Sequence, residues 1–550
     1  MIEDVIEANY VDVLQCEIYP ARIIFDTHIR SIERLNNAPN IYILPGLVDA
    51  HVHIESSMLL PSEFARIAVS HGTLAAVTDP HEIANVAGIT GIDFMWENSA
   101  RFPFQFVFGA PSCVPATSLE STGITITAND IDKLFQDGKA SFLSEMMNFP
   151  GIVYNDPNVM AKIAVAQKYG KPIDGHAPRL KGEALQKYVC AGTNGAAIVI
   201  TTDHECTSLA EAEEKIRLGM KILIREGSAA KNFNVLSSLI NLYPDMVMIC
   251  TDDFHPNDLV NGYINHFLTK GVEAGLNFFS LLRAATLNPV KHYKIDLGLV
   301  QIGDSADFIV VDNLQNFKVK QSFLKGNCIY DRMTNKFCET VKTKHVLNSH
   351  FGAAKIKQSD IVVTATSNNL KVIQAIEGDL RTEEILFNIK KNSIINSNIE
   401  ADVLKLVIVN RYQPEKPNVA FIRGFGLKKG ALASSVSHDS HHIIAVGCND
   451  YSLVKAINHI ITIKGGLAIA YNKSIIDLAL DIAGLMSSAS VEEVSEKYTT
   501  LNQLSFDLGC VLSAPFMTLS FMALLVIPEL KLGTKGLFNV NNFEWTEMFI

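Results

Sequence analysis

The sequence predicts an α/β protein built on a (β/α)8 TIM-type barrel, with a small β-unit from the flanking segments and an additional C-terminal α/β or α+β domain. Three observations lead to this fold class. Eight short apolar runs alternate with helix-like segments between residues 43 and 256, both flanks of that region are rich in strand-like patterns, and a new arrangement of strands begins near residue 355.

The eight apolar runs share one feature, because each is followed at once by ionisable or small polar residues. Runs of this length, bounded by turn signals, suit strands that are buried on both faces. The polar residues would then meet at the C-terminal ends of the strands, where barrel enzymes place their chemistry. The runs are ILPGLVDAHVH, LAAVTDPHE, FQFVFGAP, FLSEMMN, PIDGHAP, AIVITTDHE, KILIREG and MVMICTDD.

Helices are expected between the runs. Residues 62–72, 158–170, 181–192 and 208–219 show helical spacing of apolar side chains. Several of these segments begin near Ser, Asn or Asp and end at Gly, as capped helices do. Eight strand–helix units in about 250 residues match the usual size of a (β/α)8 barrel.

The flanks predict the remaining domains. Strand-like patterns in residues 1–42 and 299–345 are expected to pair into one small β-unit. We therefore predict a β-domain from residues 1–43 plus 299–350, a catalytic barrel at 44–298 and a C-terminal domain at 351–550. No low-complexity linker precedes the last domain, so a packed interface is expected rather than a tethered module.

Composition excludes several classes of protein. The net charge of −11 argues against a sequence-independent grip on nucleic acid. Nine scattered cysteines without a CxxC pair predict neither a disulfide framework nor a thiolate zinc cluster, and they exclude the zinc site of cytidine-type deaminases. The acidic N-terminus does not read as a signal peptide, and the longest apolar stretch, 516–527, is too short to cross a bilayer. A cytoplasmic protein without membrane contact is expected.

The strongest chemical signal is the pair His51 and His53 after the first run. Residues i and i+2 of a strand face the same side, so both imidazoles can point at one ion. An HxH pair alone is weak, but four further strand ends carry ligand-type side chains. Histidines combined with carboxylates suit a hydrolytic site for Zn²⁺, Mn²⁺ or Fe²⁺. The six candidate ligands are His51, His53, Glu145, His176, His204 and Asp252.

These segments resemble the adenine deaminase family of the amidohydrolase superfamily in order and spacing. The PGxxDxHxH opening and IGDSADFIVVD are shared by many amidohydrolases, whereas HIESSML, DPHEIANV and SVSHDSHHIIAVG are far more selective. The resemblance covers nearly the whole chain and rests on residues 45–61, 72–88, 142–152, 174–178, 202–205, 251–253 and 430–447.

The resemblance implies a binuclear centre. His51 and His53 would hold the first metal with Asp252, His176 and His204 would hold the second, and Glu145 would bridge or flank both. Mn²⁺ or Fe²⁺ would serve best, with Zn²⁺ as a further option. No lysine stands in FLSEMMN, so the carboxylated-lysine site of hydantoinases and dihydroorotases is not expected.

The implied reaction is hydrolytic deamination of adenine to hypoxanthine and ammonia by a metal-activated hydroxide, as in purine salvage. Asp252 is our candidate for the general base and then the acid, and Glu145 is the second proton shuttle. The family likeness also implies that adenine is the small-molecule partner. We expect a homo-oligomer, most simply a dimer.

Four further residues are candidates for substrate binding, each with a structural alternative. His81 and Glu82 follow the second run, where Asp-Pro also fits a turn and helix cap. Arg225 follows the seventh run and could instead form a salt bridge with Glu226 at the rim. Asp253 could instead support a histidine ligand.

The C-terminal segment 437–442 carries Ser437, His438, Asp439, His441 and His442. We favour a lid or structural role for it, because neighbouring residues rarely align as a serine triad.

Two other functions stay open on the sequence. One is another amidohydrolase, acting on a cyclic amide or a different aminopurine, because fold and metal site do not define the substrate. The other is a non-catalytic relative that binds a purine, against which the complete ligand set speaks. Ammonia release from adenine under defined metal loading separates all three.

Overall fold

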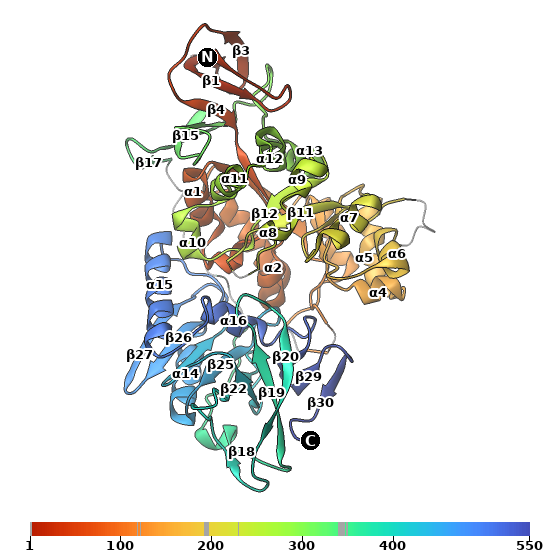
Figure 1. Ribbon diagram of the computed structural model, residues 1–550, viewed down its shortest axis with the longest axis vertical. Coiled ribbons are helices and arrows are strands. Elements are labelled where there is room, and N and C mark those ends of the chain that lie inside the picture. Colours follow the sequence, from red (N-terminus) through yellow and green to blue (C-terminus); the bar gives the residue numbers. More distant parts are fainter. Residues whose placement is uncertain are drawn as a thin grey trace. The chain divides into compact units, whose positions relative to one another are not determined.

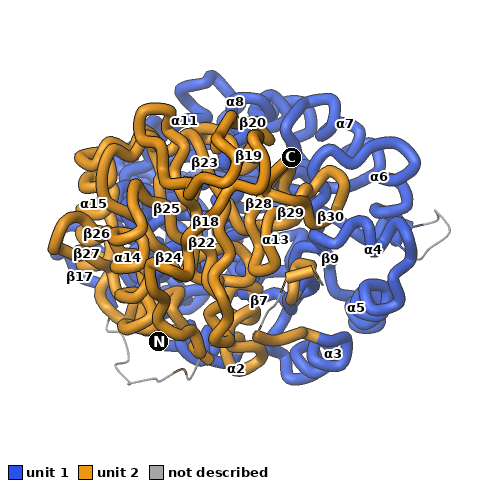
Figure 2. Tube along the Cα trace, turned by 90° about the horizontal axis from the view of Figure 1, so that it is seen from below, with its two compact units in different colours: residues 1–80, 93–113, 127–344 blue, residues 81–92, 114–126, 345–550 orange. Residues whose placement is uncertain are grey.

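The computed structural model of the chain describes residues 3–117, 119–120, 123–191, 197–228, 230–338, 347 and 350–550. Internal contacts divide the chain into two compact units, coloured separately in Figure 2. Unit 1 comprises Met1–Pro80, Asp93–Cys113 and Thr127–Lys344, and unit 2 comprises His81–Ile92, Val114–Ile126 and His345–Ile550. Two short pieces from the barrel region thus belong with the C-terminal unit.

The two flanks of the barrel form one sheet, as predicted. It has eight strands in the order β17-β16-β15-β14-β4-β1-β2-β3, near the N-terminus in Figure 1. Phe25 packs edge-on against Phe308 at a ring distance of 5.0 Å, so the two flanks also share a core. The end of the predicted segment, 339–346, lies outside the described residues. The strands are β1 (Asp4–Asp12), β2 (Glu17–Phe25), β3 (Ile29–Arg34), β4 (Tyr42–Pro45), β14 (Phe308–Val311), β15 (Val319–Leu324), β16 (Asn327–Asp331) and β17 (Lys336–Phe337).

All eight predicted runs contain a barrel strand, and the pairs that hydrogen-bond as ladders are parallel. The Thr201 N–H donates to the Ile173 carbonyl at 2.9 Å and joins β9 to β10, while β12 lies beside β5. A short strand, β13 (Asp252–Asp253), then pairs with β5. The barrel strands are β5 (Leu47–His53), β6 (Thr73–Thr78), β7 (Gln105–Ala110), β8 (Phe142–Met146), β9 (Ile173–Gly175), β10 (Thr202–Asp203), β11 (Lys221–Arg225) and β12 (Val247–Cys250).

The first run differs from the prediction, because it is two strands rather than one. β4 belongs to the flanking sheet and β5 to the barrel. Gly46 stands between them, and a Cβ there would lie 2.4 Å from Leu74 Cδ1. The missing side chain therefore lets the backbone pass close to β6 as it changes sheets.

The four predicted helices are present. They are α1 (Pro61–Ser70), α5 (Pro157–Lys168), α6 (Gly182–Val189) and α7 (Leu209–Arg217), and Figure 1 shows α5, α6 and α7 outside the barrel strands. Asp156 caps α5 and Ser208 caps α7 through their side chains. The remaining helices of this region are α2 (His81–Ser99), α3 (Ala128–Gln136), α4 (Phe149–Val153), α8 (Phe233–Leu236), α9 (Leu239–Leu242), α10 (Pro256–Asn261), α11 (Ile264–Glu273), α12 (Phe278–Ala284) and α13 (Leu287–Tyr293).

Unit 2 is built on an eight-stranded sheet in the order β20-β19-β23-β22-β25-β24-β26-β27. All its pairs are antiparallel except β19 with β23, so the predicted domain is of the α+β kind. The strands are β19 (Asn369–Ala375), β20 (Thr382–Asn388), β22 (Leu404–Val409), β23 (Asn418–Arg423), β24 (Ala431–Ser434), β25 (Ile443–Gly447), β26 (Gly466–Tyr471) and β27 (Ser474–Ala479).

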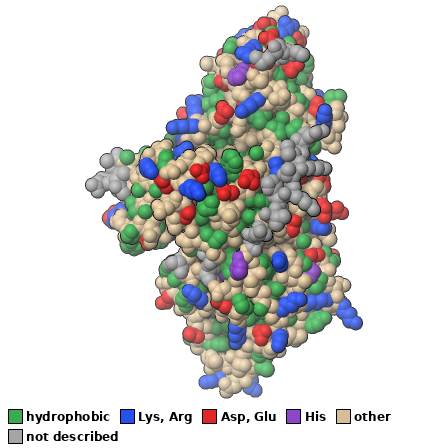
Figure 3. Space-filling model, turned by 180° about the vertical axis from the view of Figure 1, so that it is seen from behind, with side chains coloured by type: hydrophobic (Ala, Val, Ile, Leu, Met, Phe, Trp, Pro, Cys, Tyr) green, Lys and Arg blue, Asp and Glu red, His purple; other side chains and the backbone are tan. Residues whose placement is uncertain are grey.

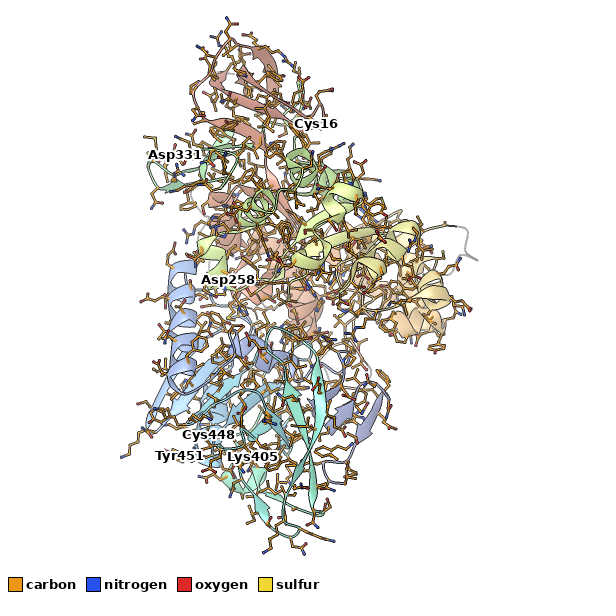
Figure 4. The ribbon with its side chains drawn as sticks, viewed as in Figure 1. Cys16, Asp258, Asp331, Lys405, Cys448 and Tyr451 are labelled. Carbon is orange, nitrogen blue, oxygen red and sulfur yellow. The ribbon has the colours of Figure 1, made fainter. Side chains whose placement is uncertain are left out.

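Three helices and short strands complete unit 2. Helix α14 (Asp450–Ile463) packs its apolar side chains on the sheet, beside α15 (Val491–Asp507) and α16 (Pro515–Phe521). Buried Lys405 of β22, labelled in Figure 4, donates to Asp450 Oδ1 at 2.6 Å and so ties the start of α14 to the sheet. The small strands are β18 (Val363–Thr364), β21 (Ile394–Ile395), β28 (Leu530–Gly533), β29 (Gly536–Asn539) and β30 (Glu544–Thr546).

The surface and the apolar stretch agree with the composition. Figure 3 shows basic side chains scattered among acidic and apolar ones on the face it draws. The apolar stretch 516–527 is largely buried, and its first part lies in α16. Among the described residues there is no helix with the length and apolar character needed to cross a membrane.

Candidate metal centre

Strand β5 presents two imidazoles at its C-terminal end. His51 and His53 are buried, and their rings lie 4.9 Å apart. Buried Asp49 shapes this strand end, because it accepts hydrogen bonds from the His51 N–H at 3.1 Å and from Thr251 Oγ1 at 2.5 Å. The Tyr263 hydroxyl donates to the same carboxylate at 2.5 Å. The carboxylate thus ties β5 to the segment after β12.

Glu145 of β8 lies between two sets of imidazole nitrogens. Its Oε1 is 3.2 Å from His53 Nε2 and 3.9 Å from His51 Nε2. Its Oε2 is 2.7 Å from His176 Nδ1 and 3.3 Å from His204 Nε2. Each carboxylate oxygen therefore faces one histidine pair.

Asp252 completes the set around the first pair. Its Oδ1 is 3.1 Å from His53 Nε2 and 3.4 Å from His51 Nε2. Two donors that bind one ion at about 2.1 Å and at right angles lie about 3 Å apart. The donor separations around both pairs are close to this value, so all six predicted ligands are brought together in unit 1.

The hydrogen bonding of His53 shows that a cation fits here. Its Nδ1 donates to the Asp79 carbonyl at 3.0 Å, because a carbonyl oxygen can only accept. In the neutral ring Nε2 then carries a lone pair, which faces the carboxylate oxygens of Glu145 and Asp252. Such an arrangement repels unless a proton or metal ion lies between the atoms, and metal-binding histidines commonly donate their second nitrogen to a carbonyl in this way.

His51 supports the same conclusion. Both of its ring nitrogens are buried and make no hydrogen bond to any described residue. Buried polar atoms are rarely left so, because an unmade hydrogen bond costs roughly 1–3 kcal/mol. The residues present therefore fit a divalent metal site, which belongs to the same site as His53.

The charges of the cluster are strongly coupled. Burial alone would raise the pKa of Glu145, but His176, His204 and His53 hold it well below its ordinary value. Burial likewise acts to raise the pKa of Asp252, and Arg225 and the two β5 histidines outweigh it and lower the pKa. Burial lowers the pKa of His204, but Glu145 and other carboxylates raise it to about 9. Both carboxylates are thus held ionised.

Arg225 contacts the cluster directly. Its Nη1 donates to Asp252 Oδ2 and to Glu205 Oε1, and all three side chains are largely buried. Glu226 instead pairs with Lys270 at 2.8 Å, so the predicted rim pair between Arg225 and Glu226 is wrong. Asp252 has φ of 61°, a left-handed conformation that costs a non-glycine residue roughly 1–2 kcal/mol. The Arg225 contact helps to hold the carboxylate in that conformation.

A buried ion pair supports the two other histidines. Asp203 accepts hydrogen bonds from the N–H groups of Ala177 and Glu205 at 2.9 and 2.8 Å, next to His176 and His204. Lys215 lies 3.2 Å from Asp203 and donates to the Ala177 carbonyl at 2.8 Å. The strand ends that carry the second histidine pair are thereby fixed to each other.

The loops after β11 and β13 are also tied together. Ser56 Oγ donates to Asp253 Oδ1 at 2.5 Å. Asp258 of α10, labelled in Figure 4, accepts from Ser228 Oγ at 2.5 Å, and this oxygen accepts from the His255 N–H at 2.8 Å. Asp253 thus has a contact with the loop after β5, and its role in substrate binding stays a prediction.

His81 and Glu82 lie in unit 2. His81 Nε2 is 3.6 Å from Glu82 Oε1, and both side chains are buried. Glu82 also contacts His438 and His441. The histidines of the C-terminal motif thus meet the candidate substrate residue of the DPHE segment.

The comparisons with known proteins agree with this arrangement. Residues 42–329 match the family model described as "Amidohydrolase family", and residues 379–544 match "Adenine deaminase C-terminal domain". A protein named adenine deaminase from Methanosarcina mazei is 49% identical over 523 residues, 92% of each chain. The chain belongs to the adenine deaminase family.

Other members of the adenine deaminase family match over almost the whole length. One from a Sulfurovum species is 48% identical and covers 98% of this chain and 99% of its own. One from Parabacteroides distasonis is 44% identical and covers 99% of both. The likeness therefore includes both units rather than the barrel alone.

Sequence reasoning missed two parts of the site. Glu205 stands beside His204 in the TDHE motif, which was quoted only for its histidine. The Asp203–Lys215 pair was also missed, because a lysine in the middle of a helix gives no sign that it is buried. The adjacent acidic residues in TDHE were the available signal for both.

Proposed function

We propose that the protein hydrolyses adenine to hypoxanthine and ammonia. The observation that carries this proposal is the near full-length similarity to adenine deaminases, which extends over the C-terminal unit as well as the barrel. The geometry of the metal centre supports a hydrolase, because ligand-type side chains meet at the C-terminal ends of the barrel strands.

The proposed metal centre takes two divalent ions. His51, His53 and Asp252 would hold one, His176 and His204 the other, and Glu145 would lie between them. Mn²⁺ or Fe²⁺ fits this mixed nitrogen and oxygen set, with Zn²⁺ as a further option. When bound, such an ion lowers the pKa of a coordinated water and so provides a nucleophile near neutral pH.

The protein's own carboxylates would move the protons. Water adds to C6 of adenine and the C6–N6 bond breaks, so one proton must leave the water and the departing amine must gain one. Asp252, held ionised beside Arg225, accepts the first proton and returns it to the amine. Glu145 is the second carboxylate that can carry a proton, to the ring nitrogen.

Substrate contacts are proposed for His81, Glu82, Asp253 and Arg225. Arg225 would act mainly through Asp252, since that carboxylate is its partner in the structure. A dimeric state and a cytoplasmic location stay predictions.

A substrate comparison tests the proposal. Under one metal loading, ammonia release is measured from adenine, adenosine, cytosine and guanine. Adenine should be clearly preferred. A preference for a nucleoside or a pyrimidine, or hydrolysis of a cyclic amide in place of adenine, would overturn the assignment.

A further inference from the structure

Glu82 lies at the start of α2, and imidazoles bind both of its carboxylate oxygens. His441 Nε2 lies 2.5 Å from Oε2, and His438 Nδ1 hydrogen-bonds Oε1. The exposed fractions of Glu82, His438 and His441 are 2%, 4% and 1%. A carboxylate buried this deeply is stable only when its oxygens are satisfied.

The ring of His441 has one defined protonation state. The Ser437 N–H donates to His441 Nδ1 at 3.2 Å, so Nδ1 is the unprotonated nitrogen. Burial lowers the pKa of His441 to about 4, which keeps the ring neutral near pH 7. Its proton therefore sits on Nε2 and is donated to Glu82. A protonated Nε2 has no lone pair for a cation, so the arrangement is that of a fixed carboxylate rather than a metal site.

His438 is fixed by stacking. Its ring lies 4.5 Å from that of Phe521 with an angle of 20° between the planes. Burial acts to raise the pKa of Glu82, but His438, His441 and His81 hold it well below the ordinary value. Glu82 is therefore an ionised acceptor in a set orientation. Each carboxylate oxygen has a second lone pair that can accept from another molecule.

Chain connectivity keeps Glu82 near the metal centre. Only three residues separate it from Asp79, so the two Cα atoms lie within about 11 Å of each other. The carbonyl of Asp79 accepts the hydrogen bond from His53. A purine is long enough to bridge such a separation.

We propose that His438 and His441 are positioning residues that hold Glu82 as the acceptor for an imidazole-ring N–H of the free purine base. This inference rests on the proposed function. Adenine carries a proton on N9 or N7, whereas a 9-substituted adenine has none on either nitrogen. Glu82 would then meet a lone pair in place of a proton, and a site built to accept an N–H rejects a ligand without one. Glu82 is thus the specificity-determining residue for base against nucleoside.

Wild-type enzyme and Glu82→Gln provide the first test. We expect metal-loaded wild-type to prefer adenine over 9-methyladenine in kcat/KM. The Glu82→Gln variant should lose roughly 10- to 150-fold on adenine and show a smaller preference, because an amide offers both a donor and an acceptor. Equal use of both purines by wild-type, or an unchanged preference in the variant, would overturn the inference.

The histidines provide the second test. His438→Ala and His441→Ala should each raise KM for adenine much more than they lower kcat, with metal content unchanged. His441→Gln, which keeps a donor, should recover part of the loss. His459→Ala is the control, because His459 pairs with Asp477 at 3.1 Å near the surface of the same unit. It should behave as wild-type.

The outcomes separate the two proposals. Wild-type that releases no ammonia from adenine refutes the proposed function and this inference together. Active wild-type with His438→Ala and His441→Ala at normal KM refutes the inference alone. Loss of one metal equivalent in His441→Ala would also refute it, because it would show a cation where we assign hydrogen bonds. If the alanine variants do not fold, the two-purine comparison on wild-type and Glu82→Gln still decides.

Discussion

Arg225→Met should destabilise unit 1 far more than the loss of a surface arginine. Arg225 alone faces both Glu205 and Asp252, and the exposed fractions of the three side chains are 8%, 12% and 8%. Removing one partner of a buried ion pair leaves the other charge uncompensated, at a cost of roughly 3–5 kcal/mol. Methionine keeps much of the length and apolar contact, so the charge is the main loss.

Urea unfolding of chelator-treated protein measures this cost without the contribution of metal binding. Arg22→Met is the matched control, because Arg22 pairs with Glu7 at 2.8 Å with 44% and 41% of the side chains exposed. Exposed pairs contribute about 0–1 kcal/mol. The double variant Arg225→Met with Glu205→Gln should recover part of the loss, since one unpaired charge is gone. If Arg225→Met costs no more than Arg22→Met, the buried cation is not what holds the two carboxylates.

Three further predictions follow from the same structure. Asp252→Asn should lower kcat about 10²–10⁴-fold with metals retained, and Asp253→Asn should act less strongly or on KM; normal turnover in the first and none in the second, with metal content measured, would exchange their roles. Glu145→Gln should purify with less metal than wild-type in elemental analysis, because Glu145 faces both histidine pairs; full metal content would contradict a bridging position. Lys531→Met should change the pH dependence of stability, since burial lowers the pKa of Lys531 from 10.5 to about 7. Between those values the unfolded chain binds more protons, so wild-type stability should rise with pH relative to the variant; parallel urea-stability curves from pH 7 to 9 would show that Lys531 titrates normally.

The barrel could be predicted because its strands are buried on both faces. Each apolar run has no choice but to be a strand, and each ends where polar residues begin. The same pattern could not show that the first run changes sheets, since Gly46 matters only through its approach to Leu74. The pairing of the flanks followed from strand-like composition and was confirmed by the order of the first sheet.

The ligand set could be predicted for a similar reason, because every member stands at a strand end. Partners that come from other elements could not. Arg225 was separated from Asp252 by a helix and a strand, and only the parallel pairing of β11 with β12 brings them together. The contact of Glu82 with His441 joins residues 359 positions apart, which no local pattern records.

Metal titration of the chelated enzyme tests the central claim most directly. Metal-free protein should release no ammonia from adenine. Activity should rise with added Mn²⁺ or Fe²⁺ and level off at two equivalents per chain, with hypoxanthine and ammonia formed in equal amounts. Full activity without bound metal would contradict the account, as would a fully loaded enzyme that leaves adenine unchanged.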